Sequence, residues 1–139
     1  MIRIAAAALT ALMISSSAFA VEFEANDDGL IAFSMPSGNV GCVYVPAGGT
    51  ATYEPRDGGP ELACDRVEPS YVRVILDSAG KAIRLNNVGD ASCCGADNIF
   101  KYGQVWQEGP FKCISAASGL TCTRGAHGFS LSHKSVKAY

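Results

Sequence analysis

The 139-residue sequence lacks the features that mark nucleic-acid-binding and membrane-spanning proteins. It has no cluster of Lys or Arg that could neutralise phosphates, and its formal net charge is −2, so we expect no nucleic-acid partner. The longest largely apolar run, residues 4–14, is shorter than the roughly 20 residues of a transmembrane helix. Beyond residue 20, no window of about 11 residues keeps a helical period, and no basic amphipathic helix occurs. The sequence therefore predicts no membrane span and no helical domain.

Signatures of catalysis and of metal binding are also missing. There is no Gly-x-Ser-x-Gly nucleophile elbow, no Cys-x-x-Cys redox pair, and no calcium-loop pattern after residues 26–29 (NDDG). A zinc site would have to draw on these side chains: Cys93, Cys94, His127 and His133. Neighbouring cysteines lack the spacing of zinc ligands. We therefore expect no metal, no cofactor and no enzymatic activity.

The amino terminus is typical of a secretory signal peptide. Arg3 precedes the apolar residues 4–14, and residues 18–20 (AFA) form a small-x-small cleavage pattern. The short apolar run and the single basic residue are typical of bacterial signals. We predict a signal peptide at 1–20 and one domain at 21–139, exported to the periplasm or the medium.

Six cysteines in an exported chain predict three disulfides. The clearest pair lies in residues 110–124 (PFKCISAASGLTCTR), where a four-residue loop at 116–119 would set Cys113 opposite Cys122 in a β-hairpin. Directly opposed residues lie about 4.5–5.5 Å apart at Cα, within the range that a disulfide needs. The sequence therefore predicts a bridge between Cys113 and Cys122.

The other four cysteines leave several connectivities open. If Cys42 pairs with Cys64, Cys93 must bond its neighbour Cys94, whose Cα lies about 3.8 Å away across a trans peptide, below the usual disulfide range. The alternatives join Cys42 and Cys64 separately to the adjacent pair, whose side chains point to opposite faces of an extended segment. We favour this staple over the vicinal disulfide. A vicinal pair would also allow a thiol switch.

Short apolar runs bounded by turn residues indicate β-strands. Residues 30–33 and 40–45 flank a turn, and the glycine- and proline-rich residues 46–60 are expected to form an exposed loop. Residues 71–77 and 81–86 are expected to form a hairpin across Ser78-Ala79-Gly80.

In that hairpin, Val72, Val74 and Leu76 share one side of the strand. The last residues, 133–139, have room for one helical turn at most. The sequence predicts an all-β fold, a single small disulfide-bridged domain of antiparallel hairpins arranged as a sandwich or a barrel.

Most aromatic residues lie in the second half of the chain. Phe111 and Phe129 are expected in the core, with Trp106 covering one end of it. The alternative places Trp106 and Tyr102 on an exposed face as anchors for a protein or sugar partner. We take four residues as the candidate binding surface: Tyr102, Trp106, His127 and Phe129.

His127 lies among small residues in GAHGFS, which predicts an accessible turn. With Ser37 and either Asp65 or Asp90 it would make a hydrolase triad, although Ser37 lies in a plain turn sequence, PSGN. A histidine in a glycine turn more often serves to hydrogen-bond a loop.

Five stretches follow one another along nearly all of residues 21–139: 33–42 (FSMPSGNVGC), 64–66 (CDR), 102–104 (YGQ), 119–122 (GLTC) and 127–132 (HGFSLS). In these motifs the chain resembles a family of secreted bacterial six-cysteine proteins catalogued only as a domain of unknown function. It departs from the family pattern at Met35, where serine is expected, and at Ala126, where glycine is expected. The resemblance implies a secreted, cysteine-bridged domain and no known activity.

The sequence therefore predicts an exported, disulfide-stabilised binding or envelope-associated module whose partner is a protein or glycan of the cell envelope. One alternative is a periplasmic enzyme inhibitor that presents the loop 46–60 to a partner's cleft. The other is a small hydrolase that uses His127.

Overall fold

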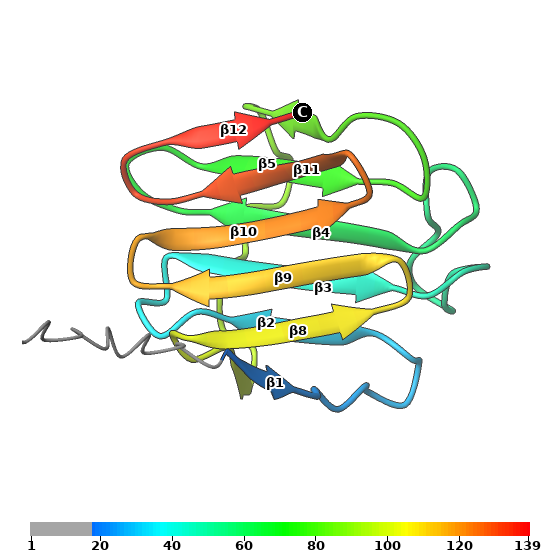
Figure 1. The fold of residues 1–139 in the computed structure, drawn as a ribbon. Helices are drawn as coiled ribbons and strands as arrows, with labels where there is room; N and C mark the ends of the chain where they lie inside the picture. The colour runs from blue at the N-terminus through cyan, green and yellow to red at the C-terminus, as the bar shows by residue number, and fades with distance from the viewer. Residues whose placement is uncertain (1–17) are drawn as a thin grey trace, which may run out of the picture.

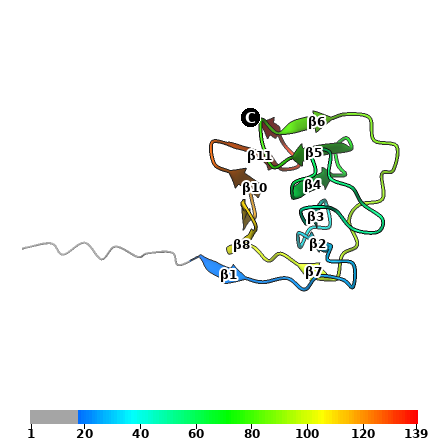
Figure 2. The same ribbon diagram turned by 90° about the vertical axis from the view of Figure 1, so that its right-hand side faces the viewer.

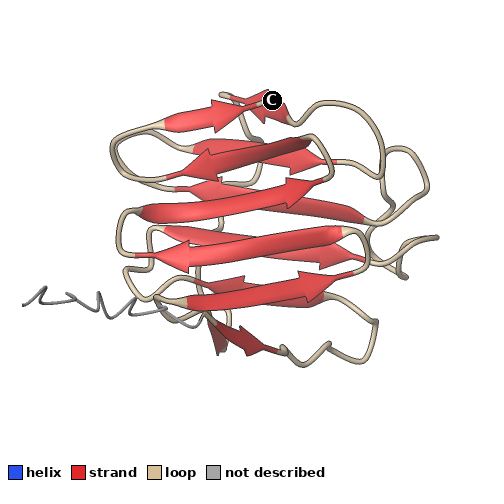
Figure 3. Ribbon diagram, viewed as in Figure 1, coloured by secondary structure: helices blue, strands red, loops and turns tan. Residues whose placement is uncertain are grey.

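The computed structural model describes residues 18–139, and these residues form two six-stranded β-sheets packed face to face (Figures 1 and 2). Strands and loops account for all of the described chain (Figure 3). The predicted all-β fold is confirmed, and its arrangement is a sandwich. Between residues 18 and 139 no helix could serve as a membrane span. Most of the predicted signal peptide, residues 1–17, lies outside the described residues.

Apart from β1 (Phe19–Val21), the chain completes sheet B before it forms sheet A. Sheet B has the order β6-β5-β4-β3-β2-β7 and comprises β2 (Ile31–Ser34), β3 (Val40–Val45), β4 (Glu61–Arg66), β5 (Val72–Leu76), β6 (Ile83–Leu85) and β7 (Asn98–Ile99). Sheet A has the order β1-β8-β9-β10-β11-β12 and comprises β1 (Phe19–Val21), β8 (Gln104–Glu108), β9 (Phe111–Ala116), β10 (Gly119–Arg124), β11 (His127–Leu131) and β12 (Val136–Ala138). Two edge strands pair in parallel, β1 with β8 and β7 with β2, and all other pairs are antiparallel.

Both predicted hairpins are present. Strands β5 and β6 pair across the turn at 78–80, and β9 and β10 pair with Cys113 opposite Cys122. The second turn is shorter than expected, because Ala116 and Gly119 also pair. Residues 133–139, which have room for one helical turn at most, form no helix: they include β12, which pairs with the free edge of β11. Ladder hydrogen bonds to an existing edge outweigh the weak helical tendency of so short a segment.

The core lies between the two sheets and takes most of its buried residues from the inner strands of each sheet, β2–β5 and β8–β11. Val72, Val74 and Leu76 of β5 are all buried there, as their spacing predicts. An aromatic cluster surrounds Phe33, whose ring centroid lies 5.0 Å from that of Trp106 and 5.3 Å from that of Phe100. Aromatic pairs at these separations add to the stabilisation from burial alone.

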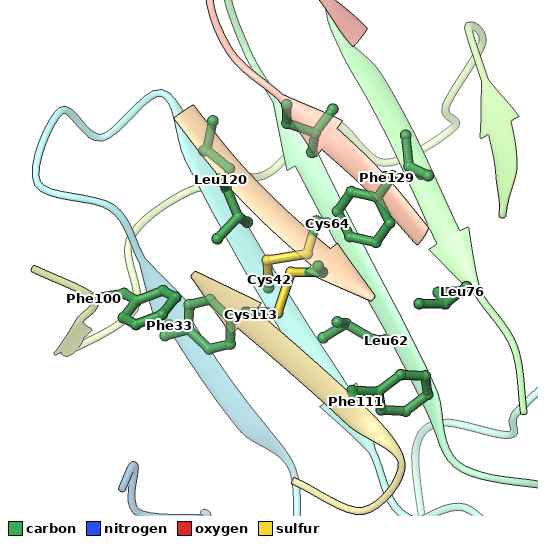
Figure 4. Close-up of a cluster of buried hydrophobic side chains, with 14 of the residues drawn as sticks. Phe33, Cys42, Leu62, Cys64, Leu76, Phe100, Phe111, Cys113, Leu120 and Phe129 are labelled. Carbon is green, nitrogen blue, oxygen red and sulfur yellow. A yellow bond between two sulfur atoms is a disulfide. The ribbon is translucent and has the colours of Figure 1, made fainter. Parts of the chain in front are cut away.

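Two disulfides lie inside this core, among the large apolar side chains (Figure 4). Cys113–Cys122 joins β9 to β10, as predicted, and Cys42–Cys64 joins β3 to β4, each with a Cα–Cα distance of 4.1 Å. Each disulfide therefore links two neighbouring strands within its own sheet.

The favoured staple between these strands and residues 93–94 is therefore wrong. Strands β3 and β4 pair with Cys42 directly opposite Cys64, so the nearest sulfur for each is the other. The remaining two cysteines form a vicinal disulfide, Cys93–Cys94, across a cis peptide bond. Three disulfides and no free cysteine are compatible with an oxidising, exported environment.

Candidate functional site

The outer face of sheet B, the side away from sheet A, carries the best candidate site. The outward side chains of its central strands are small: Ala32 of β2, Gly41 and Val43 of β3, and Ala63 of β4. Two long loops, residues 46–60 and residues 86–97, run beside this face (Figure 2). Small side chains below and loops on either side leave a hollow between them.

This hollow, which we call the sheet B groove, has a volume of about 280 Å³. Ala32, Gly41, Val43 and Ala63 form its floor, and it is open to solvent on one side. It follows β3 and β4 from Gly41 and Asp65 at one end to Val45 and Glu61 at the other. Four residues along a strand span about 13 Å, which suits a small ligand or the end of a longer one.

A charged cluster forms the first end of the groove. Arg73 donates two hydrogen bonds to the Asp65 carboxylate, from Nε to Oδ1 at 2.7 Å and from Nη2 to Oδ2 at 2.8 Å. The Tyr71 hydroxyl also donates to Oδ2. Strand pairing sets Asp65 directly opposite Arg73, so the side chains need no long reach to meet. The cluster is therefore a fixed planar pair rather than a flexible surface contact.

The cluster changes the acidity of its members in a consistent direction. The hydrogen bonds from Arg73 to Asp65 raise the pKa of the arginine further above its ordinary value. Burial and the hydrogen bond to Asp65 raise the pKa of Tyr71. Both shifts preserve the charge state in which Arg73 is cationic and Tyr71 keeps its proton.

The vicinal disulfide forms the wall beside this cluster. The backbone N–H of Cys93 donates to the Tyr71 hydroxyl at 3.2 Å, and Arg73 Nη2 donates to the Asp90 carbonyl at 3.2 Å. The disulfide packs directly on Gly41: a Cβ added there would lie 2.9 Å from Cys93 Sγ. Glycine at position 41 is thus what allows residues 90–96 to lie against the sheet.

The other end of the groove is acidic and carries an exposed aromatic ring. Tyr53, in the loop 46–60, is 53% exposed and lines the groove near Glu61. Burial raises the pKa of Glu61, and the neighbouring Asp77 carboxylate acts in the same direction. The charged side chains that line the groove are therefore one arginine, Arg73, and three acidic residues: Glu61, Asp65 and Asp90.

The loop 46–60 is more firmly attached than the sequence suggests. Pro55 is buried, and Asp57 accepts hydrogen bonds from the Ser78 backbone at 3.1 Å and from its hydroxyl at 2.6 Å. This hydroxyl contact lowers the pKa of Asp57. The loop therefore frames the groove and is attached along part of its length to the turn between β5 and β6.

A second hollow of about 510 Å³ lies where turns of both sheets meet, and it contains Tyr102, Ser37 and His133. Asn39 supplies the one side-chain amide of this lining. It already donates to the Glu68 carbonyl at 3.1 Å and accepts from the Glu68 N–H at 2.7 Å, so it is not free to bind a ligand. We therefore regard the sheet B groove, with its charged cluster, as the stronger candidate.

The structure does not unite the residues expected to form a binding surface. Trp106 and Phe129 are 1% and 0% exposed, so their expected place in the core is confirmed, and their inclusion in the candidate binding surface is wrong. Tyr102 is 46% exposed and lines the second hollow. His127 begins β11 and is half-buried opposite Arg124. Apolar burial between the sheets takes the two largest of the four side chains.

The residues considered for a hydrolase triad are also separate. His127 belongs to sheet A, whereas Asp65 and Asp90 line the groove on the outer face of sheet B. Ser37 lines the second hollow. Among residues 18–139, no group of three or more His, Cys, Asp or Glu side chains is arranged to hold a metal ion.

Sequence reasoning missed the pairing of Asp65 with Arg73. The signal was present, because opposite charges lie in CDR (64–66) and YVRV (71–74), two runs joined by a short link. Treating these runs as a hairpin would have set the two charges on one face.

Comparison of the chain with protein-family models, with curated proteins and with solved structures gives no match.

Proposed function

We propose that this protein is an exported, disulfide-stabilised binding module that recognises a saccharide of the cell envelope in the sheet B groove. The observation that carries the proposal is the coexistence, in one groove, of a small-residue floor, an exposed aromatic ring and a fixed carboxylate–guanidinium pair. A sugar ring presents the complementary features, an apolar face and a rim of hydroxyl groups.

The size and charge of the groove restrict the ligand. At about 280 Å³ it lies just below the roughly 300–1,000 Å³ range of small-molecule sites. Its single arginine is already bound to Asp65, and Glu61 and Asp90 add further carboxyl groups. Anionic ligands such as phosphates would be repelled. Neutral or amino saccharides fit this balance.

Each wall of the groove has a defined part in the proposed complex. The Asp65 carboxylate and the Arg73 guanidinium are coplanar acceptors and donors that can bond neighbouring hydroxyls of one ring. At the opposite end, Tyr53 offers an aromatic face on which a sugar can stack. The Cys93–Cys94 disulfide supplies an apolar wall beside the charged cluster, where it packs on Gly41.

A blocked groove tests the proposal. The chain predicted to remain after signal cleavage, residues 21–139, is applied to an array of neutral, amino and acidic oligosaccharides, and binding of each hit is measured by calorimetry. Ala63→Phe fills the floor and should weaken binding of a neutral or amino saccharide at least about tenfold, because the ring occupies the ligand's place. Ile114→Phe is the matched control, because Ile114 is 44% exposed on the outer face of sheet A.

Two results would contradict the proposal. One is that no neutral or amino saccharide on the array binds above background. The other is that Ala63→Phe and Ile114→Phe bind equally well, since a ligand unaffected by a filled groove must lie elsewhere.

A further inference from the structure

The three disulfides differ in their access to solvent. The sulfurs of Cys42–Cys64 and Cys113–Cys122 lie in the core, in residues that are 0–3% exposed. Cys93 and Cys94 are only half-buried and lie on the outer face of sheet B, where they line the groove. An attacking thiolate can therefore reach this bond in the folded protein, whereas the other two require the sandwich to open.

The vicinal disulfide also differs in what it holds. The buried pair Cys42–Cys64 links two strands, and so does Cys113–Cys122. Residues 93 and 94 are neighbours in one loop, and that loop is attached to the sheet by other contacts. These include Ala96 N–H to Ser34 Oγ at 3.3 Å, and Arg73 to the Asp90 carbonyl. Opening the vicinal bond therefore removes no cross-link between strands.

We propose that Cys93–Cys94 is a redox-exchange site of the folded protein, whose substrate is a dithiol. A thiolate of the dithiol attacks one of the two sulfurs and forms a mixed disulfide, while the other cysteine leaves as a thiolate and takes up a proton. The second thiol of the substrate then displaces the remaining cysteine. Two cysteine thiols and one oxidised, disulfide-bonded substrate result, so two electrons pass from the dithiol to the protein.

The position of the two cysteines favours a dithiol over a monothiol. After the first attack, the released thiolate sits on the residue next to the mixed disulfide and can close the original bond again. A monothiol has no second group to compete with this reversal, whereas a dithiol resolves the mixed disulfide from within the same molecule.

Reduction of the Cys93–Cys94 disulfide should change the structure of the sheet B groove. The Cys93–Cys94 disulfide packs on Gly41. The N–H of Cys93 donates to the Tyr71 hydroxyl, which in turn donates to the Asp65 carboxylate. Separation of the two sulfurs changes the packing at Gly41 and the first of these hydrogen bonds. The exchange site is thus connected by direct contacts to the charged end of the groove, whatever ligand the groove binds.

Thiol labelling of the native protein tests the proposal, and the chain is well suited to it. Tryptic cleavage places Cys93 and Cys94 on one peptide, 85–101, and Cys113 and Cys122 on another, 113–124, while Cys64 lies on 57–66. The folded protein is treated with dithiothreitol or with glutathione at equal thiol concentration, quenched with iodoacetamide and digested. With dithiothreitol, peptide 85–101 should gain two labels at least about tenfold faster than either other peptide.

Two further measurements complete the experiment. Amide NMR spectra of the reduced protein should show shifts at Gly41 and Ala96, with the Cys113 and Cys122 amides unchanged. Cys93→Ser/Cys94→Ser, which has no exchangeable bond, should keep the same urea midpoint as the selectively reduced native chain.

The proposal is overturned if all three disulfides open at the same rate, which would show that reduction follows global unfolding. It is also overturned if 85–101 remains unlabelled while the core disulfides react, or if glutathione reduces the site as completely as dithiothreitol. None of these readouts involves a saccharide, so this proposal and the proposed function fail independently.

Discussion

At the scale of single residues, Arg66 is the most unusual side chain in the structure. It is 4% exposed and faces inward from β4. Its guanidinium donates to the Ser70 carbonyl and hydroxyl, and also to the Ser132 carbonyl at 3.1 Å. Within residues 18–139 no carboxylate lies at ion-pair distance from it. Because Arg66 belongs to β4 and Ser132 follows β11, this one side chain connects sheet B to a loop of sheet A.

We predict that Arg66→Met lowers the free energy of unfolding by about 2–4 kcal/mol, because the charge-assisted hydrogen bonds from the buried guanidinium to the Ser70 and Ser132 carbonyls are lost. Arg84→Met is the control: Arg84 is exposed, and within residues 18–139 its side chain hydrogen-bonds only Asn86, so its loss should stay within about 0.5 kcal/mol. Urea unfolding at neutral pH measures both. Equal stability of the two variants would mean that the cost of desolvating Arg66 cancels its hydrogen bonds.

At the scale of elements, the two core disulfides close hairpins of different lengths. Cys113 and Cys122 are 9 positions apart, whereas Cys42 and Cys64 are 22 apart and enclose the loop 46–60. A cross-link that closes a longer loop removes more freedom from the unfolded chain. The vicinal pair encloses almost none.

These ring sizes predict an order of stabilities for three double variants. Replacing Cys42 and Cys64 by alanine should cost about 3.4 kcal/mol, and replacing Cys113 and Cys122 about 2.7 kcal/mol. Replacing Cys93 and Cys94 should cost about 1 kcal/mol or less. Chemical denaturation without reductant gives all three values. If the 93/94 variant were the least stable, the vicinal bond would have a structural part that its position does not suggest.

The same elements show what sequence alone can reveal. The β9–β10 hairpin was predictable down to its disulfide, because a short turn fixes which residues face each other. The pairing of Cys42 with Cys64 was not, because fifteen residues of loop, 46–60, carry no information on register. Alternation also placed Val72, Val74 and Leu76 correctly, since burial on one face follows directly from the period of a strand.

The groove, in contrast, could not have been predicted from any one stretch of sequence. Its floor comes from β2, β3 and β4, and its walls come from two loops that are distant in the chain. Small outward residues such as Gly41 and Ala63 look unremarkable until a neighbouring segment is seen to need the space. Trp106 attracted attention as a possible anchor for the opposite reason, although its size is explained by the core.

At the scale of the whole molecule, each sheet is nearly contiguous in the chain. No disulfide in the described part joins sheet A to sheet B. The chain between β6 and β7 includes exposed residues around Gly89, where an added side chain would meet no neighbour within 4 Å. A cut there leaves β1–β6 on one fragment and β7–β12 on the other. Each fragment then lends one edge strand to the other's sheet, through β1 and β7.

We therefore predict that the protein survives cleavage at this point. With a specific protease site inserted at 87–89, the cut chain should elute as one species in size-exclusion chromatography. It should separate into two fragments in urea without any reductant, because only non-covalent contacts join them. Native cut chains that elute apart would show that apolar packing between the sheets is too weak to hold them.

The arrangement of sulfur bonds has a consequence for recovery from denaturation. Each disulfide joins two strands of one sheet or two residues of one loop. An unfolded chain that keeps its disulfides therefore still holds β3 next to β4 and β9 next to β10. No disulfide among the described residues fixes how sheet A faces sheet B. The docking of one sheet on the other must therefore re-form at each refolding through non-covalent contacts, the packing of the core side chains and hydrogen bonds such as that from Arg66 to Ser132.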